Sequence, residues 1–209
     1  MLITAIEPRK SRRSALFLDG EFAMNIDTET LLQAGWRVGR EVDDEELFAL
    51  KQRSEMHRAN EKALSLLEYR NHSKQELVEK ICRSTGSSAA QAAADRMEEL
   101  GLIDDANFAR NYARELFSRK GYASSRVFYE LVRKGIEKEL AQEIVEEFCP
   151  DPVEKIEEWI KRKYRGVFAT EKERRRGIQA LQRLGYSYED IKKALQELGD
   201  RQILDEDEF

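Results

Sequence analysis

The sequence has few of the residues on which turn-rich or disulfide-bonded proteins depend. Its 209 residues include 3 prolines, 11 glycines and 2 cysteines. Scarce proline and glycine favour helices over a turn-rich β-sandwich, and two cysteines are too few for a disulfide framework. We interpret Cys82 and Cys149 as reduced, small buried side chains of a cytoplasmic protein. Because no run of about 18 apolar residues occurs, we expect no membrane span, and the N-terminal residues do not have the pattern of a signal peptide.

Patterns typical of catalysis are also missing. The sequence has no glycine-rich phosphate loop of the Walker or dinucleotide type, and no nucleophile stands at a recognisable spacing from a base. His57 and His72 lie in polar stretches, and neither has a helical ligand spacing to the other or to Cys82, which argues against a zinc site. We therefore expect a protein that is not an enzyme and that uses no cofactor and no metal.

Charge is abundant and unevenly distributed. Asp, Glu, Lys and Arg make up 37% of the chain, and the net charge is −5, which argues against a protein that binds nucleic acid over its whole surface. Residues 160–183 nevertheless carry nine Lys or Arg against two Glu, and a smaller basic cluster lies at residues 9–13. Acidic blocks occupy residues 41–46 and 205–208. Local patches of this kind decide where a polyanion docks.

The N-terminal region predicts a small β element. Asp19-Gly20 is typical of a two-residue type I′ turn, because both residues tolerate positive φ. A turn there places Phe17 opposite Phe22 and Ala15 opposite Met24. Residues 2–6 supply a candidate third strand. A short helix at residues 28–34, which Gly35 ends, is expected to cover the hairpin.

From about residue 44 the patterns are helical only, and the fold class is mainly α. Residues 51–62 are almost wholly polar, so they form either a solvated helix or a hinge. We then expect helices at about 59–70, 73–84 and 87–100, at 105–119, 123–134 and 137–148, and at 152–164, 170–184 and 187–198. The second and third sets align at an offset of fifty residues, which places Leu131 opposite Leu181 and Gly135 opposite Gly185.

A period near fifty residues indicates tandem three-helix repeats that form an elongated array beside the small N-terminal β-hairpin or three-strand element. The predicted segments are 1–45 (β-hairpin element plus short helix), 46–103 (linker helix and first repeat), 104–150 (second repeat), 151–199 (third repeat) and 200–209 (acidic tail).

The stretch GLIDD, residues 101–105, has two interpretations. Its adjacent aspartates are either metal or acid–base ligands, or they begin a helix. Gly101 suits the left-handed position after a helix, Leu102 and Ile103 are expected to be tucked between units, and Asp104 or Asp105 accepts the free N–H groups of the next helix. A catalytic pair needs a third ligand or a base nearby, and the sequence offers no obvious one. We interpret the stretch as a joint, followed by one apolar helix face made of Phe108, Ala109, Tyr112, Ala113, Leu116 and Phe117.

Cations recur at equivalent positions of the second and third repeats. Arg126 and Arg133 are seven residues apart and hence share one helix face, while Phe128, Leu131 and Val132 supply the buried side. Two interpretations stay open: a solvated face near helix C-termini, where positive charge is mildly favourable, or a surface for a polyanion or an acidic partner. The candidate partner- or DNA-binding residues are Arg119, Lys120, Arg126, Arg133, Lys134, Arg174, Arg175, Arg176 and Arg183.

Short motifs follow one another in a defined order along the helical region. They are Ser73-x-x-Glu76-Leu77-x-x-Lys80-Ile81, the GLIDD stretch with Phe108-Ala109 and Tyr112, then Arg126, Glu130-Leu131 and Lys134-Gly135-Ile136. Each motif alone is common, but their order and spacing over about residues 59–199 resemble the RecX family of bacterial regulatory proteins. The N-terminal hairpin resembles an extension found in some members of that family.

This resemblance implies a cytoplasmic, monomeric, non-enzymatic regulator of the RecA recombinase, in DNA repair, recombination and the SOS response. Such a protein lies along the groove of the RecA–single-stranded DNA filament, with or without direct contact to the single-stranded DNA. There it modulates, and mainly inhibits, ATPase activity, strand exchange and filament growth. Whether it only inhibits filaments or also stabilises them stays open. The alternatives are a helical module that binds DNA directly without RecA, and a generic scaffold for another protein.

Overall fold

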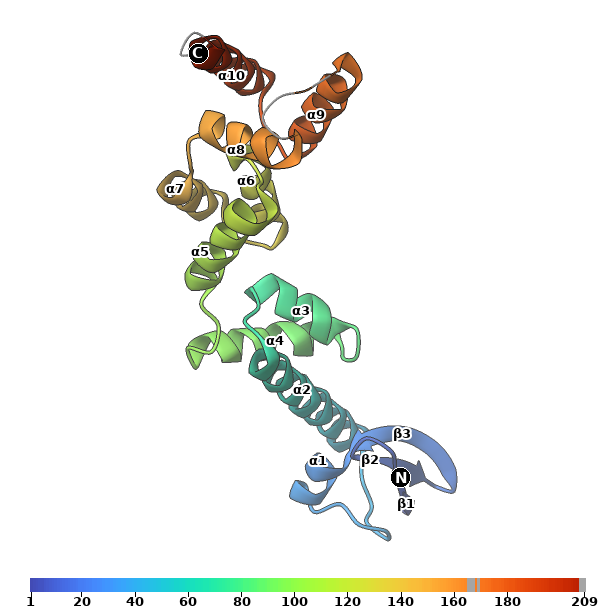
Figure 1. Ribbon diagram of the computed structural model, residues 1–209. Helices are drawn as coiled ribbons and strands as arrows, with labels where there is room; N and C mark the ends of the chain where they lie inside the picture. The colour runs from blue at the N-terminus through green and yellow to red at the C-terminus, as the bar shows by residue number, and fades with distance from the viewer. Residues whose placement is uncertain (165–167, 169, 207–209) are drawn as a thin grey trace. The chain divides into compact units, whose positions relative to one another are not determined.

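The computed structural model describes residues 1–164, 168 and 170–206 (Figure 1). As predicted, this part of the chain is mainly helical and includes a three-stranded antiparallel sheet of order β1-β2-β3. It divides into two compact units, Met1–Asp104 and Asp105–Phe209. The elements are β1 (Ile3–Arg9), β2 (Arg13–Leu18), β3 (Glu21–Asp27), α1 (Thr28–Gln33), α2 (Asp44–Tyr69), α3 (Lys74–Cys82), α4 (Ser87–Glu99), α5 (Asp105–Glu115), the π-helical turn η1 (Leu116–Lys120), α6 (Ser124–Arg133), α7 (Lys138–Phe148), α8 (Pro152–Tyr164), α9 (Glu171–Arg183) and α10 (Tyr188–Glu206).

The predicted Asp-Gly turn joins β2 and β3. Asp19 has φ 50° and Gly20 has φ 88°, and Phe17 pairs with Phe22 as predicted, with ring centroids 5.9 Å apart. The predicted pair of Ala15 with Met24 is wrong, because Ala15 lies opposite Asn25 and Leu16 opposite Met24. The register shifts between Leu16 and Phe17, and such an irregularity moves every pair farther from the turn by one residue.

The inner face of the sheet packs on α1 and on the first turns of α2. Ile3, Leu16 and Ile26 are fully buried there together with Leu31 of α1 and Leu50 of α2. Helix α1 begins after Asp27, whose side chain accepts a hydrogen bond from the Thr30 N–H, and the chain then turns at Gly35 with φ 67°. Both ends of this helix agree with the prediction.

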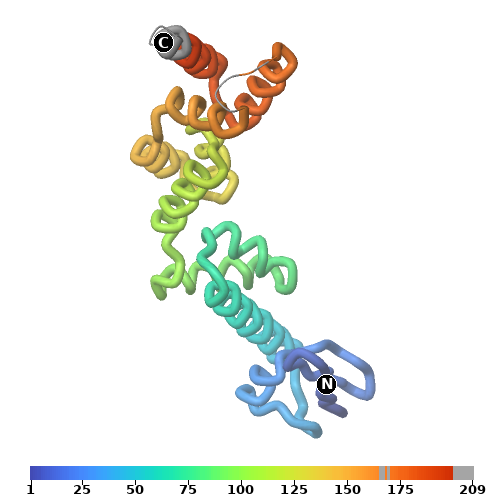
Figure 2. Tube along the Cα trace, viewed as in Figure 1, coloured from blue at the N-terminus to red at the C-terminus, as the bar shows by residue number. Residues whose placement is uncertain are grey.

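Helix α2 is longer than predicted. Where we expected a polar helix or hinge at residues 51–62 and a separate helix from residue 59, the structure has one uninterrupted helix (Figure 2). Asp43 and Glu46 form a capping box that begins it. Its buried positions, Leu50, Ser54, Ala59 and Ala63, form a narrow stripe of mostly small residues that apolar periodicity does not reveal.

The second half of α2 packs on α3 and α4 to form the first three-helix bundle. Its core is rich in alanine, including Ala90, Ala93 and Ala94, and small side chains let helix backbones approach closely. At the end of α4, Gly101 takes φ 70° and its N–H donates to Glu98 O over 2.8 Å, as expected for a helix-ending glycine.

The GLIDD stretch is a joint, as predicted. Helix α5 begins at Asp105, directly after Asp104, and Ile103 is buried in the core of the first bundle. The expectation for Leu102 is wrong: its side chain is half exposed. The left-handed Gly101 reverses the chain, so that only one of the two apolar residues after it faces the core.

The second unit contains two bundles of similar construction. Helices α5, α6 and α7 with η1 enclose one core, and α8, α9 and α10 enclose another that also takes in Ala123. Leu131 and Leu181 are fully buried at equivalent positions, and Gly135 and Gly185 both have positive φ, 83° and 98°. The bundles contact through Ala123 N–H, which donates to Leu184 O over 2.9 Å, and Ser125 Oγ, which donates to Gly185 O over 2.7 Å.

The arrangement of all segments as an elongated array, and their division at the predicted boundaries, stay predictions. Helix α10 continues to Glu206, beyond the end expected at residue 198. Residues 207–209 of the predicted acidic tail lie outside the described residues. None of the described helices combines the length and hydropathy that a bilayer crossing requires.

The burial predicted for the two cysteines is wrong. Cys149, the residue after α7, is exposed rather than buried, and its Sγ lies 2.8 Å from Ser124 Oγ. Cys82 is half-buried, and neither cysteine forms a disulfide. His72, which lies in a polar stretch of the sequence, is buried, and its Nδ1 lies 3.1 Å from Glu76 Oε2.

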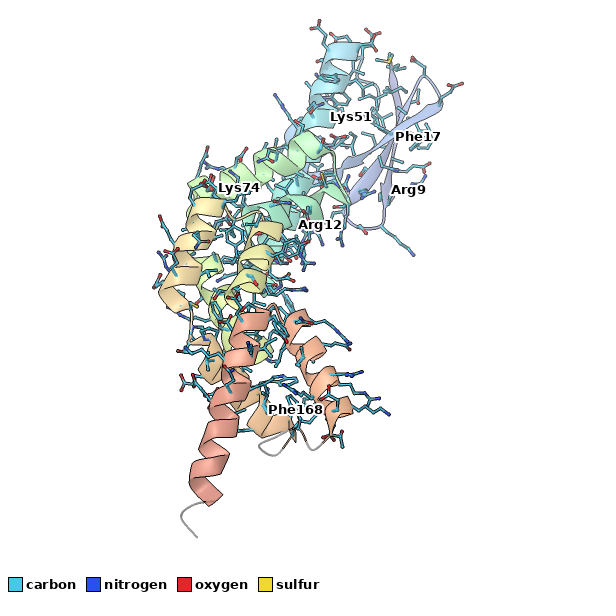
Figure 3. The ribbon with its side chains drawn as sticks, turned by 90° about the horizontal axis from the view of Figure 1, so that it is seen from above. Arg9, Arg12, Phe17, Lys51, Lys74 and Phe168 are labelled. Atoms are coloured by element: carbon cyan, nitrogen blue, oxygen red, sulfur yellow. The ribbon has the colours of Figure 1, made fainter. Side chains whose placement is uncertain are left out.

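Gly177 provides a test of packing in the bundle of α8, α9 and α10. A Cβ added at this glycine lies 2.3 Å from the ring of Phe168 (labelled in Figure 3), which packs edge-on against Tyr164. We expect Gly177→Ala to lower the free energy of unfolding by about 1–3 kcal/mol, because overpacking displaces the ring. The matched control is Gly199→Ala on α10, where an added Cβ meets no atom within 4 Å and the loss of a helical glycine stabilises by about 0.5–1 kcal/mol. Denaturant unfolding measures both, and equal effects would contradict the packing.

His72 makes the stability of the first unit depend on pH. Burial lowers the pKa of His72 below its ordinary value of 6.5. The unfolded chain therefore takes up a proton more readily than the folded chain, and stability that is complete above pH 6.5 falls as the pH drops below it. Between pH 6.5 and 5.5 we expect the wild-type free energy of unfolding to fall more steeply than that of His72→Gln, by up to about 1.4 kcal/mol per pH unit. Parallel pH profiles of the two proteins would contradict this assignment.

Candidate cationic partner-binding surface

The candidate surface of the second repeat is built around a buried carboxylate on α6. Arg126 and Arg133 share one face of this helix, as their spacing predicts, and Glu130 lies between them. Arg126 Nη2 is 3.1 Å from Glu130 Oε1, and Arg133 Nη2 is 2.6 Å from Glu130 Oε2. The Glu130 side chain is only 5% exposed, whereas those of Arg126 and Arg133 are 41% and 60% exposed. One carboxylate thus positions two guanidinium groups that still face solvent.

Tyrosine rings lie beneath the cations. The Arg126 guanidinium is 5.3 Å from the centroid of the Tyr122 ring, and Lys134 Nζ is 5.8 Å from that of Tyr112. Burial and then the nearby negative charge of Glu130 raise the pKa of Tyr112. These contacts add modest cation–π attraction and hold the cations against the bundle.

The other second-repeat cations lie on η1. Arg119 and Lys120 are exposed in this π-helical turn, which ends at Gly121 with φ 65°. Arg119 Nη1 is 3.3 Å from Glu115 Oε1. Beside η1 is a hollow of about 220 Å³ whose lining includes Arg119, Arg162 and Trp159. The hollow joins cations from the second and third repeats at one place.

Helix α9 carries the third-repeat cations. Arg174 and Arg175 pair with Glu171 over 3.8 and 3.2 Å. Arg176 and Arg183 are exposed, and neither has an ion-pair partner among the residues that the structure describes. They occupy the positions equivalent to Arg126 and Arg133, but Ala180 stands where the second repeat has Glu130.

The cations of the second repeat, on α6 and η1, lie close to those of the third repeat, on α9. A Cβ added at Gly185, two residues after Arg183, lies 2.7 Å from the Cβ of Arg126, so the first turn of α6 contacts the chain just beyond α9. The arrangement therefore brings the predicted residues onto neighbouring helices of one unit. Arg165, part of the basic stretch, lies outside the described residues.

Sequence reasoning missed several residues of this surface. Tyr129, exposed on α6 beside Arg126 and Arg133, gives the cationic face an aromatic side chain, and tyrosine and arginine are enriched at binding hot spots. Trp159 lines the hollow beside η1, and Lys163 Nζ is 4.7 Å from its ring centroid. The pairing of Glu130 with both arginines could be predicted from the sequence, because it lies four residues after Arg126 and three before Arg133. The burial of its side chain could not.

Chemically, this surface is suited to binding anions. Guanidinium groups bind carboxylates and phosphates through paired N–H donors. Exposed guanidinium groups that are held in place lose less conformational freedom on binding than mobile ones. The arrangement therefore favours an acidic protein surface or a phosphate backbone as its ligand.

The Glu130 pairing predicts a strong dependence of stability on both arginines. In Arg126→Gln/Arg133→Gln the carboxylate stays buried without a cation, so we expect the free energy of unfolding to fall by about 1–3 kcal/mol. Adding Glu130→Gln removes the unpaired charge and restores most of the loss. Urea unfolding of the double and triple variants measures this difference, and equal stabilities would show that the arginines do not stabilise Glu130.

Comparisons with known proteins agree with this architecture. The family model that matches is RecX, second three-helix domain, over residues 104–144, a span that includes α5 and α6 and ends within α7. Two crystal structures of RecX proteins share the fold. One is 23% identical, with a TM-score of 0.58 and coverage of 92% of this chain and 98% of that chain. The other, from Lactobacillus salivarius, is 22% identical, with a TM-score of 0.55 and coverage of 69% and 97%.

Relatives in other bacteria extend the match over nearly the whole sequence. The regulatory protein RecX of Caldanaerobacter subterraneus subsp. tengcongensis is 30% identical over 201 residues, which cover 93% of this chain and 98% of the relative. That of Bacillus licheniformis is 30% identical over 203 residues, which cover 93% and 76%. Because the match to the Caldanaerobacter protein is 30% identical and covers almost the full length of both chains, this protein belongs to the RecX family of regulatory proteins.

Proposed function

We propose that this chain regulates the RecA recombinase by binding the RecA–single-stranded DNA filament through the cationic faces of α6 and α9. The observation that carries the proposal is the repetition of an exposed arginine pair, Arg126 with Arg133 and Arg176 with Arg183, at equivalent positions of two bundles in contact. Family membership supports the regulatory role, and the repeated pairs supply a physical means of contact.

A protein with repeated contact surfaces suits a periodic polymer. Each pair engages an acidic or phosphate group, and the second contact gains from the effective concentration that the first one creates. A chain bound to several filament subunits impedes the movements that ATP turnover, strand exchange and filament growth require. In this proposal the protein acts as a monomer in the cytoplasm and makes or breaks no covalent bond.

The two arginine pairs are expected to differ in strength. In the second repeat, Glu130 neutralises part of the charge of Arg126 and Arg133. In the third repeat, the equivalent position is Ala180, so Arg176 and Arg183 offer both charges to a partner. We therefore assign the larger share of binding free energy to α9.

The alternative function is direct DNA binding without RecA. Three-helix units with exposed arginines also suit a phosphate backbone, because the neutralised phosphates release counterions. That function predicts tight duplex or single-strand binding by the isolated protein, with an affinity that falls steeply as salt rises.

We predict that Arg176→Gln/Arg183→Gln raises the concentration needed for half-maximal inhibition of RecA ATPase by about tenfold or more, equivalent to about 1.4 kcal/mol. Both side chains are exposed, so the variant keeps its helicity. The matched control is Lys51→Gln/Arg96→Gln, which removes the same charge from exposed positions of the first unit. Inhibition that is equally strong in all three proteins would refute the assigned surface.

A second arm separates the two functions. Binding to single- and double-stranded DNA is measured without RecA at two salt concentrations. Weak binding there, with ATPase inhibition that depends on the α9 arginines, supports filament binding. Sequence-selective duplex binding without RecA supports the alternative. Charge reversal at Arg126 and Arg133 is unsuitable for this test, because two new carboxylates would repel the buried Glu130.

A further inference from the structure

A group of metal-ligand side chains lies in the first unit, at the junction of the sheet and α2 and outside the cationic surface. Asp27 ends β3, and His57 and Glu61 lie four residues apart on α2, hence on one face of that helix. One ligand atom from each residue lies within 4.8 Å of the other two. The strand end and the helix therefore direct two carboxylates and an imidazole toward one point.

The imidazole and the buried carboxylate have the separation of two ligands of one ion. His57 Nδ1 lies 3.1 Å from Asp27 Oδ1, yet Nδ1 is buried and has no hydrogen-bond partner of acceptable geometry. Ligand atoms about 2.0–2.1 Å from a tetrahedral ion lie about 3.3 Å from each other. The contact is thus close to ligand geometry and poorly aligned for a hydrogen bond.

Neighbouring groups hold these ligands in place. Asp27 Oδ1 accepts hydrogen bonds from the N–H and Oγ1 of Thr30, and the Asp27 N–H donates to Ser54 Oγ over 2.8 Å. His57 Nε2 lies 3.6 Å from Glu29 Oε2. A carboxylate beside Nε2 favours a proton on that nitrogen and leaves the Nδ1 lone pair for a cation, which is the arrangement common among metal-ligating histidines.

Positive charge nearby competes with a cation at this point. Arg12, an exposed residue of the β1–β2 turn labelled in Figure 3, places Nη1 2.9 Å from Glu61 Oε1. A metal ion at the junction must therefore draw Glu61 away from Arg12.

We propose that Asp27, His57 and Glu61 form a binding site for a divalent transition-metal ion, with Zn²⁺ as the probe. One nitrogen and two carboxylate oxygens suit Zn²⁺, and a water molecule completes four-coordination. The bound ion joins β3 to the middle of α2, and binding to the folded state alone stabilises the first unit.

The test uses the full chain with Cys82→Ser/Cys149→Ser, so that no thiol contributes, after removal of metal by a chelator. Titration calorimetry with Zn²⁺ is expected to show one equivalent bound, and the thermal midpoint of unfolding is expected to rise. His57→Asn and Glu61→Gln are each expected to weaken binding at least tenfold. Glu68→Gln, an exposed acid on the same helix, is the matched control and is expected to bind as the parent does.

The variant Arg12→Gln distinguishes the proposed site from adventitious binding of Zn²⁺ at the surface. Because this variant frees Glu61 from its ion pair, we expect it to bind Zn²⁺ several-fold more tightly than the parent. Glu61 and Arg12 are on the surface, so their variants stay folded even if His57→Asn does not. Absent binding in the parent, or binding that Glu61→Gln and Arg12→Gln leave unchanged, would overturn the proposal.

Discussion

In each bundle of the second unit, a buried leucine followed four residues later by a left-handed glycine fixes how the helices pack. Leu131 of α6 and Leu181 of α9 are fully buried, and their carbonyl oxygens accept the N–H groups of Ile136 and Tyr186 across the turns at Gly135 and Gly185 over 3.2 Å. This combination ends each helix and inserts the next apolar side chain into the same core. The outward face of each helix is thereby determined too, and that face carries the arginines. The candidate surface is thus a consequence of how the two bundles bury their leucines.

Local sequence rules predicted the features that depend on neighbouring residues. The Asp19-Gly20 turn, the helix end at Gly101 and the apolar face of α5 each follow from a few adjacent side chains. The pairing of β2 with β3 on the far side of Phe17 from the turn was not predictable, because a strand irregularity leaves no mark in residue type. The continuity of α2 was missed for a related reason: Ser54 and Ala59 are buried, but neither is a strong apolar signal.

The candidate sites were predictable only in part. Helical spacing placed Arg126 and Arg133 on one face, and the fifty-residue offset identified Arg176 and Arg183. The burial of Glu130 depends on how the helices of its bundle pack, which no spacing specifies. The group of Asp27 with His57 was not predictable from either residue, because a strand end and a helix thirty positions later meet only in the folded chain.

The ion pairs of the cationic surface differ in how readily a partner can replace them. Arg119, Arg174 and Arg175 pair with exposed Glu115 and Glu171, and such exposed pairs contribute about 0–1 kcal/mol each, so an anionic ligand exchanges them at little cost. The pairs with Glu130 are different, because removing an arginine leaves a buried carboxylate without a cation. In the proposed function, Arg126 and Arg133 therefore engage a partner through their remaining N–H donors without leaving Glu130. The second repeat thus presents guanidinium groups in fixed positions, whereas α9 presents groups that adapt to the ligand.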